Sequence, residues 1–513
     1  WAGNRPARRM REDDGRNCPA DPTERNFIRM VSRKKVLKIS LTVLAVYAIL
    51  ACLFYFLAGD QLRFRNSRGN VEMLPAESGT VELVQGAVVE QSFAARIQRL
   101  ETVSVQWGTY YRPNAGTITM ELIDASTGTV LLSGQFDAAA IAEGGLTTLT
   151  ADAPIETAYG VPLVLRLTAD SQAGSAASPL MAATLPETYA EQTLEASQLT
   201  LNGVPAAGAL CYAVSGEDYI WTGLHYWKFC AAGAVLILLF LFVFWKRCRA
   251  GKRSYLLNAA HAMRKYRFLI RQLVSRDFKT KYKRSVLGVF WSFLNPLLTM
   301  IVQYFVFSTI FKSDIPNYPA YLLVGIVSFN FFSESCGMAL TSILGNASLI
   351  TKVYVPKYVY PLTRVLSSVI NLGISLIPLV LVCVFTGVQF RKSVVLAFFF
   401  LLCLILFSYG LSLLLSAAMV FFRDMQFLWN VLSMIWMYAT PIFYPESILP
   451  ENFRFVLAIN PLYYFIQNAR LCILDGLSPE PTAYLQCMLI ALGMLLVGSL
   501  VFRKSQDRFV LYL

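Results

Sequence analysis

The sequence predicts a polytopic α-helical membrane protein with about eight transmembrane helices and an inserted extracytoplasmic antiparallel β-sandwich domain. The 513 residues are 56% hydrophobic and only 15% charged, with a mean hydropathy of +0.50. Soluble proteins are about 45–50% apolar and about 25% charged. Long apolar runs recur along the chain, and one long polar segment of short alternating runs interrupts them. This composition excludes a soluble enzyme.

Eight apolar segments have the length of about 17–25 residues that crosses about 30 Å of hydrocarbon as a helix. In chain order these segments are 36–58, 226–245, 286–311, 320–345, 361–386, 395–421, 425–443 and 482–501. We expect the first segment to remain as an anchor and not to be cleaved as a signal peptide. Its apolar run is too long for such a peptide, and it lacks a clear small-residue cleavage pattern.

The distribution of Lys and Arg predicts the orientation in the membrane. Residues 1–35 contain ten basic residues, and residues 246–284 contain fourteen against a single acid, so both segments are expected in the cytoplasm. Residues 61–226 contain seven basic and seventeen acidic residues and are expected outside. Both termini are then cytoplasmic. Topology and lipid headgroups account for most of the net charge of +13, so no nucleic-acid partner is expected.

The polar segments differ in the structure that they predict. Residues 1–35 form a basic tail that is expected to be disordered. Residues 60–225 contain short, partly alternating runs separated by Gly, Asn, Asp and Ser, which is typical of an antiparallel β-sandwich. Residues 254–284 mix apolar and basic side chains, and they predict an amphipathic helix lying in the cytoplasmic interface.

Catalytic and metal chemistry find little support in the residues. Only two histidines occur, His225 and His261, and no Cys pair has CxxC spacing, so no metal site is expected. The long polar segment contains only Cys211, which excludes an internal disulfide framework there. No GxxxxGK[ST] loop is present, so the chain is not expected to bind ATP directly.

An ordered series of motifs runs through the second half of the chain. It comprises Arg276–Lys279, Tyr282–Gly288, Trp291, Asn295–Pro296, Tyr321–Gly325, Phe331–Ser335, Asn346–Pro356, Phe422–Met425, Pro441–Pro445 and Asn460–Leu462, with Arg470 and Gly476 downstream. Each motif is weak, but the series resembles the membrane subunit of type-2 ABC exporters, in the branch that moves O-antigen, capsule or teichoic-acid polymers. The segments before residue 260 have no counterpart in that resemblance.

The resemblance implies a permease domain of six helices over 286–505, with a re-entrant external segment at 444–475. It implies a homodimer in the bacterial cytoplasmic (inner) membrane that works with two copies of a separate ATPase subunit. ATP and Mg²⁺ would be bound by that partner, and the permease itself would not be an enzyme. The expected contacts are membrane lipid and a lipid-linked glycan substrate.

Candidate functional residues fall into three groups. The expected ATPase-coupling residues are Arg276, Asp277, Lys279, Tyr282, Asn346, Leu349, Lys352, Tyr354, Pro356, Arg423 and Asp424. The expected translocation path contains Trp291, Phe331, Phe332, Glu334, Trp429, Trp436, Tyr438 and Tyr444. Glycan contact on the β-domain is expected at Trp107, Tyr110 and Tyr111. Aromatic rings are expected in the path because sugar rings stack on them.

Each assignment has a structural alternative. The interface helix could be a membrane anchor, the 346–357 segment an ordinary turn, and the aromatic residues core packing. Glu334, expected near the bilayer middle, could be a hydrogen-bonded group that holds helices together. The β-domain could be a spacer or a dock for another protein. For the whole chain, the alternatives are an exporter of drugs or small lipids and a non-transporting receptor or scaffold.

Overall fold

The computed structural model describes residues 33–94, 96–156, 160–193, 197–249, 263–283, 285–311, 315–352, 355–450, 452 and 454–512. The tail at 1–32 and the first part of the expected interface helix lie outside the described residues. The chain divides into two compact units. One unit contains Trp1–Ala58 and Tyr226–Leu513, and the other contains Gly59–His225.

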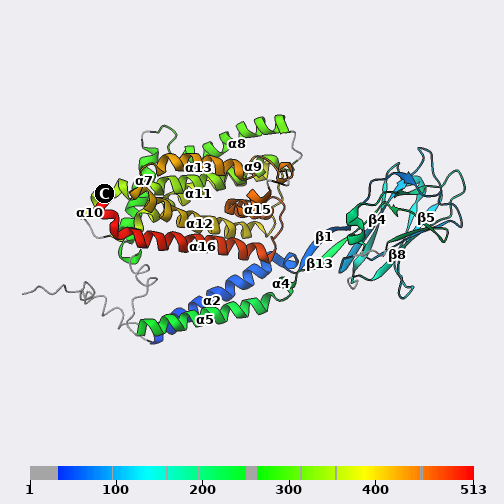
Figure 1. Ribbon diagram of the computed structural model, residues 1–513, viewed down its shortest axis with the longest axis horizontal. Coiled ribbons are helices and arrows are strands. Elements are labelled where there is room, and N and C mark those ends of the chain that lie inside the picture. Colours follow the sequence, from blue (N-terminus) through cyan, green and yellow to red (C-terminus); the bar gives the residue numbers. More distant parts are fainter. Residues whose placement is uncertain are drawn as a thin grey trace, which may run out of the picture. The chain divides into compact units, whose positions relative to one another are not determined.

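The first unit is helical, and seven of its described helices are long and apolar enough to cross a membrane (Figure 1). They are α2 (Arg33–Ala58), α5 (Tyr226–Arg249), α8 (Phe290–Phe311), α9 (Tyr318–Leu340), α11 (Val359–Phe385), α12 (Val394–Phe421) and α16 (Pro481–Ser505). The prediction of a polytopic helical membrane protein is confirmed, with one span fewer than the eight expected.

The missing span is the expected segment 425–443, which contains α13 (Met425–Ala439). Its 15 residues extend about 22 Å, short of the about 30 Å of a hydrocarbon core. The helix ends at Ala439, because the backbone of Thr440 is extended and the next residue, Pro441, does not continue a helix. After this break come η4 (Glu446–Ile448), α14 (Arg454–Ile459) and α15 (Pro461–Ile473). The side chain of Asn460 caps α15 by accepting from Leu462 N at 3.1 Å.

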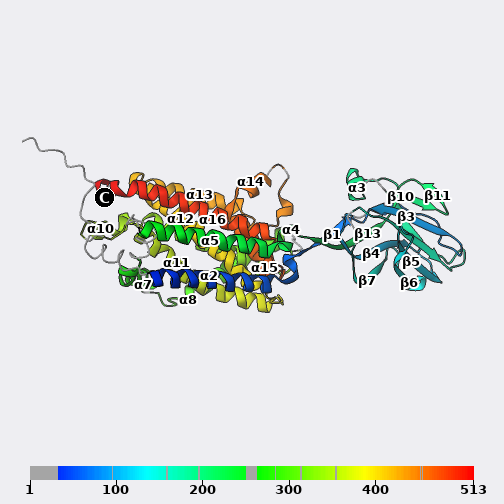
Figure 2. The ribbon, with the colours of Figure 1, turned by 90° about the horizontal axis from the view of Figure 1, so that it is seen from below.

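The helices of the bundle pack around α9 and α12, which carry many of its buried residues. Helices α12 and α16 lie side by side along the bundle (Figure 2). Their backbones touch, since a Cβ atom added at Gly498 would lie 2.0 Å from the carbonyl oxygen of Gly410. Glycine at position 498 therefore sets the closest approach of the two helices.

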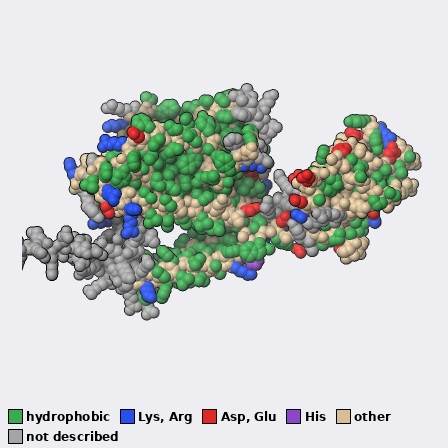
Figure 3. Space-filling model, in the orientation of Figure 1, with side chains coloured by type: hydrophobic (Ala, Val, Ile, Leu, Met, Phe, Trp, Pro, Cys, Tyr) green, Lys and Arg blue, Asp and Glu red, His purple; other side chains and the backbone are tan. Residues whose placement is uncertain are grey.

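The surface of the bundle divides by chemistry. Figure 3 shows hydrophobic side chains over its long sides, with Lys and Arg side chains gathered at the end that holds α7 (Arg267–Tyr282) and α10 (Ala347–Lys352). The C-terminal helix α17 (Phe509–Tyr512) lies at this same end, because Phe509 packs in one buried cluster with Leu273 of α7. This is the pattern of a membrane bundle with one basic interfacial end.

The second unit is an antiparallel β-domain with two sheets. One sheet has the order β1-β13-β4-β9-β12, with β2 paired to β9 and β7 paired to β4. Its strands are β1 (Phe64–Val71), β2 (Ser78–Gly79), β4 (Arg99–Gly108), β7 (Leu146–Glu156), β9 (Ser178–Ala182), β12 (Ala209–Leu210) and β13 (Tyr212–Tyr219).

The other sheet has the order β11-β10-β3-β8-β5-β6. Its strands are β3 (Val88–Ala94), β5 (Thr117–Asp124), β6 (Val130–Asp137), β8 (Pro162–Ala169), β10 (Gln198–Leu201) and β11 (Val204–Ala206). Short helices flank the strands at η1 (Gly59–Leu62), η2 (Ala138–Ala140), α3 (Glu187–Gln192) and α4 (Trp221–Leu224).

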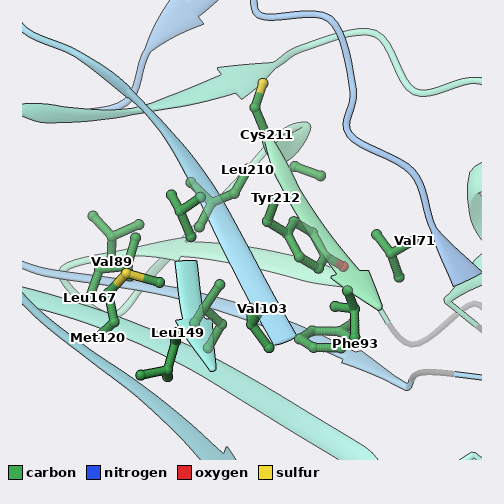
Figure 4. Packing of buried hydrophobic residues seen from close by; sticks show 14 of the residues in the cluster. Val71, Val89, Phe93, Val103, Met120, Leu149, Leu167, Leu210, Cys211 and Tyr212 are labelled. Carbon is green, nitrogen blue, oxygen red and sulfur yellow. The ribbon is translucent and has the colours of Figure 1, made fainter. Parts of the chain in front are cut away.

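Both sheets contribute to one core. Alternate residues of β4, β5 and β8 point inward, as the period of two in a strand requires. Figure 4 shows Val103 of one sheet in the same buried cluster as Met120 and Leu167 of the other. The rings of Phe93 and Tyr212 meet there with centroids 5.0 Å apart. The shared core identifies a two-layer sandwich, as the sequence predicts.

Candidate coupling and translocation surfaces

Helix α7 lies against the basic end of the bundle through its apolar face. Leu273 is buried in a cluster that joins α7 to α11, α12, α16 and α17, and Leu269 and Ile270 pack against the same cluster. The opposite face of α7 carries exposed basic side chains, including Lys279. Helix α7 is therefore amphipathic and covers the second part of the expected interface helix, whose residues 254–262 lie outside the described residues.

An ion pair fixes α7 to α11. The side chain of Asp277 is only 3% exposed, and its Oδ1 lies 3.0 Å from Nη1 of Arg364, which is 20% exposed. Arg276 is more exposed and lies 3.4 Å from the same carboxylate oxygen. Arg276 also donates to Oδ1 of Asn346 at 3.2 Å. Two of the predicted coupling residues, Arg276 and Asn346, are thus in direct contact although 70 positions separate them.

A second polar network ties the end of α7 to the core of the bundle. Nζ of Lys281 lies 2.8 Å from Oε1 of Glu334 in α9, and Nδ2 of Asn371 donates to that oxygen at 2.6 Å. The hydroxyl of Tyr282 donates to Oδ1 of Asn371 at 3.0 Å and also bonds the hydroxyl of Ser292. One network therefore spans α7, α8, α9 and α11.

The position of Glu334 differs from the expected one. Helix α9 ends at Leu340, so Glu334 lies six residues, or about 9 Å, from the end of the helix that faces α7. The expected span had run to residue 345 and placed this carboxylate near the bilayer middle. Its contacts with Lys281 and Asn371 favour the alternative in which it holds helices together.

Within the 346–357 segment, the described residues form the end of η3 (Leu344–Asn346) and α10, and those from Val355 onward lie outside regular helices and strands. Asn346 is buried and donates to the carbonyl of Ser342 at 2.8 Å, while Leu349 packs against the α7 cluster. Lys352 is exposed and Pro356 is half-buried. Tyr354 lies outside the described residues. This segment and α7 thus share one hydrophobic cluster, which an isolated turn would not.

Arg423 and Asp424 form the turn between α12 and α13, and both side chains are exposed. The turn lies at the α7 end, since Phe421 packs on Phe509 and Tyr512 near the C-terminus. Across the described residues no ion pair joins Arg423 to Asp424. Their side chains therefore add exposed charge at this end of the bundle.

The predicted path residues separate into buried and exposed ones. Phe331, Phe332 and Trp429 are at most 5% exposed, and the ring of Phe332 packs on Trp429 and Trp436 at 5.8 and 5.0 Å. Within one chain these rings are buried in the hydrophobic core and do not line a translocation path. Trp291 and Tyr438 are 45% and 58% exposed on α8 and α13.

The break after α13 is held by a buried arginine that sequence reasoning noted only as part of the family pattern. Arg470 of α15 is 3% exposed, and its guanidinium donates to the carbonyls of Pro441 at 2.7 Å and Ile442 at 3.0 Å. It lies 3.5 Å from the ring centroid of Tyr321 in α9. An arginine in an otherwise apolar segment was the available signal.

The same region supplies the contacts of two predicted path residues. Trp436 donates from Nε1 to Oδ1 of Asn460 at 2.8 Å, and the hydroxyl of Tyr444 donates to the carbonyl of Tyr438 at 2.6 Å. These bonds and those of Arg470 satisfy the backbone and polar groups that a helix break leaves open. The break is therefore stabilised by specific hydrogen bonds and is a defined part of the bundle.

The β-domain corrects one of the expected glycan contacts. Trp107 is fully buried in the sandwich core, and its Nε1 donates to the hydroxyl of Thr147 at 2.7 Å. It cannot touch a ligand, because it lies on the inward face of β4. Tyr110 and Tyr111 are 48% and 91% exposed in the loop that follows β4.

Comparison with known proteins identifies the class of the bundle. The profile of the ABC-2 type transporter family matches residues 269–474. An O-antigen export system permease protein of Myxococcus xanthus is 32% identical over 247 residues, which are 48% of this chain and 95% of that protein. The chain therefore belongs to the ABC-2 type transporter family of membrane proteins.

Other relatives agree on the class. An O-antigen export system permease protein of Klebsiella pneumoniae is 32% identical over 46% of this chain and 92% of that protein. A polysialic acid transport protein of Escherichia coli is 22% identical over 46% and 93% of the respective chains. Because each match covers less than half of this chain, about 270 of its residues lie outside the match to each of these relatives.

Proposed function

We propose that this chain is the membrane-spanning permease of an ABC exporter whose cargo is a lipid-linked cell-surface polysaccharide of the O-antigen or capsule type. The observation that carries this proposal is the match over nearly the whole length of three relatives named O-antigen export permeases, at 30–32% identity. A teichoic-acid-like polymer is a variant of the same cargo, since it too is a long polar chain on a lipid anchor.

The energy for export comes from a separate ATPase that binds ATP and Mg²⁺, with one copy for each of two permease chains. It docks on the basic end of the bundle, where Arg276 and Lys279 are exposed on α7 and Lys352 is exposed on α10. Movement of the docked ATPase reaches the core through the Asp277–Arg364 and Lys281–Glu334 pairs. The exposed turn at 423–424 completes this docking surface.

The polymer path lies between two copies of the chain. Helices α8 and α13 expose most of their apolar side chains, which a second copy and the path would cover. Trp291 and Tyr438 are the exposed rings on these helices that a sugar chain could stack upon. The break held by Arg470 forms the outer gate, together with Tyr444 and Trp436.

The orientation follows from the charge distribution. The basic end with α7, α10 and the C-terminus faces the cytoplasm of a bacterial cell, and the acidic β-domain lies outside its inner membrane. This arrangement places the docking surface where ATP is available. It also places the β-domain on the side to which the polymer is delivered.

The cargo is tested by depleting the chain in its source organism and measuring the polymer on both sides of the membrane. We expect surface polysaccharide to fall and its lipid-linked form to accumulate in the cytoplasm, with recovery on re-expression. Unchanged surface polysaccharide in fully depleted cells would refute polymer export. Altered resistance to drugs or altered small-lipid distribution in its place would favour the exporter of compact substrates.

The docking surface is tested by charge reversal. Lys279→Glu and Lys352→Glu should abolish co-purification of the ATPase encoded beside this chain, because both lysines are exposed at the basic end. Lys392→Glu is the control, since this exposed lysine precedes α12 at the opposite end of the bundle. Equal loss in all three variants, or in none, would contradict the assignment. A chain that binds no ATPase at all would favour the receptor.

A further inference from the structure

The loop between β4 and β5 presents two tyrosines to solvent in an unusual backbone conformation. Tyr110 and Tyr111 have φ values of +55° and +53° and are 48% and 91% exposed. The left-handed region disfavours side chains with a Cβ atom, and glycine or asparagine normally occupies it. The β-domain follows this rule elsewhere, with Asn202 and Gly203 at its other pair of consecutive left-handed residues.

Backbone preference explains tyrosine at neither position, since asparagine or glycine would relieve the backbone. Packing does not explain Tyr111, because a ring that is 91% exposed adds little to the core. Strain that is retained in a folded protein points to a function for the residues that carry it. The function of this loop is therefore carried by the tyrosine side chains and not by the turn itself.

The loop is held in place from below by a carboxylate. Glu143 accepts hydrogen bonds from the amide and the hydroxyl of Thr109, both at 2.7 Å, and from the amide of Tyr111 at 3.3 Å. These bonds lower the pKa of Glu143 below its usual value of 4.5, with the Thr109 hydroxyl as the largest cause. The carboxylate is thus ionised at neutral pH and holds the backbone of the loop at Thr109 and Tyr111.

Charged groups flank the rings. The guanidinium of Arg112 lies 4.9 Å from the ring centroid of Tyr110, pairs with Glu82 at 2.5 Å and donates to the carbonyl of Ala176 at 3.2 Å. Sugars present apolar C–H faces that stack on aromatic rings and hydroxyls that bond to charged groups. An exposed pair of tyrosines beside fixed charges matches both features.

The loop also lies at the end of the β-domain opposite to the point where the chain enters and leaves the sheets. The chain enters the sheets at Phe64 and leaves at Tyr219, which pair with each other. Strand β4 begins beside this point, with Arg99 opposite Glu217, and runs for ten residues, or about 30 Å, to Gly108. The tyrosines therefore lie at the end of the domain remote from its connections to the membrane helices.

We propose that the Tyr110–Tyr111 loop is a saccharide-binding site, and that its ligand is the polysaccharide that this permease exports. The identity of the ligand rests on the proposed function. The family profile covers only residues 269–474, so the domain and its site are additions that the family match does not describe. A site of this kind would hold the emerging polymer chain beside the exporter.

The test uses the full chain in lipid nanodiscs and, as probe, lipid-free surface polysaccharide purified from the source organism, with dextran as the non-cognate polymer. We expect wild type and Tyr111→Phe to bind the probe. The double variant Tyr110→Asn/Tyr111→Asn should bind at least tenfold more weakly, and Val204→Thr, at an exposed site on the other sheet, should bind as wild type.

The second measurement tests whether the asparagine substitutions destabilise the β-domain. Buried Cys211 reports opening of the β-domain through its rate of alkylation, measured on its own peptide. The double asparagine variant should be alkylated no faster than wild type, because the substitutions suit the left-handed backbone. Weaker binding together with faster alkylation would overturn the inference, since the tyrosines would then be supporting the fold.

The two proposals fail in different ways. If depletion of the chain blocks export but the wild-type chain does not bind the probe, or the asparagine variant binds equally well, the saccharide site is refuted and the exporter stands. If depletion leaves polymer at the surface, the proposed function fails and the assignment of the exported polymer as ligand fails with it.

Discussion

Removing Arg364 should expose how strongly the interface helix depends on one ion pair. Arg364→Met leaves the carboxylate of Asp277, which is 3% exposed, without its partner at 3.0 Å and with only the longer contact to the more exposed Arg276 at 3.4 Å. Its second oxygen, Oδ2, has no hydrogen-bond partner among the described residues. At 3.0 Å the direct attraction is about 5 kcal/mol for an effective dielectric constant of about 20. Leaving a buried charge unpaired typically costs about 3–5 kcal/mol.

The structure predicts an order among the variants. Arg364→Met should cost about 3 kcal/mol of unfolding free energy. Asp277→Asn should cost about 1–2 kcal/mol, since it leaves a partly hydrated guanidinium and no buried charge. The double variant should cost less than the sum of the two by about 2 kcal/mol. Arg276→Met is the matched control, and its exposed contact at 3.4 Å should contribute less than about 1 kcal/mol.

The assay is unfolding of the purified chain in mixed micelles at increasing dodecyl sulfate, followed by tryptophan fluorescence. The same variants in proteoliposomes with the ATPase would show whether loss of the pair lowers polymer-stimulated ATP hydrolysis. A cost for Arg364→Met no larger than that for Arg276→Met would refute the reasoning. So would strict additivity in the double variant, because it would mean that the two charges do not interact.

Three further predictions concern packing, pH and thiol reactivity. Gly498→Ala should destabilise the bundle by about 1–3 kcal/mol or more, because the added Cβ would clash with the backbone of α12. Gly493→Ala lies on the same helix with open space around it, so this variant should be neutral or stabilising in thermal melts. The pKa of Glu143 is lower in the folded domain than in the unfolded chain. Its contribution to stability is therefore present above the usual carboxyl pKa and is lost as the pH falls through the lowered value, so protease cleavage in loop 109–111 should increase on acidification. Burial raises the pKa of the Cys211 thiol to about 11, so at pH 8 iodoacetamide should modify it only after the domain opens, and fast labelling of the folded domain would contradict its placement.

The fold class could be predicted from local patterns in the sequence. Seven of the predicted spans are helices of sufficient length and hydropathy, because the requirement to bond every backbone group inside a bilayer is a property of each segment alone. Strands such as β5 and β8 formed within the predicted β-sandwich segment 60–225, because the alternation of inward and outward side chains is also local. The exception was 425–443, where apolar composition continued across Pro441 although the helix ended before it.

Candidate site residues were less predictable, because burial is a property of the packed structure. Trp107 and Tyr111 are four residues apart, yet one is fully buried and the other almost fully exposed. Trp107 lies on the inward face of β4, whereas Tyr111 lies in the loop that follows the strand and turns away from the core. Phe332 and Tyr438 divide in the same way, since aromatic composition does not distinguish a ring in the core from one on an exposed helix face.

The sequence by itself determined the membrane class, the approximate spans, the inserted β-domain and the family, since these depend on composition, periodicity and ordered motifs along the chain. Only the tertiary structure decided that Lys281 reaches Glu334, that Arg364 neutralises Asp277, and that Arg470 holds the break after α13. Such pairs join residues 29 to 87 positions apart. A charged side chain takes its partner from whatever folding brings within about 4 Å, and no local pattern contains that distance.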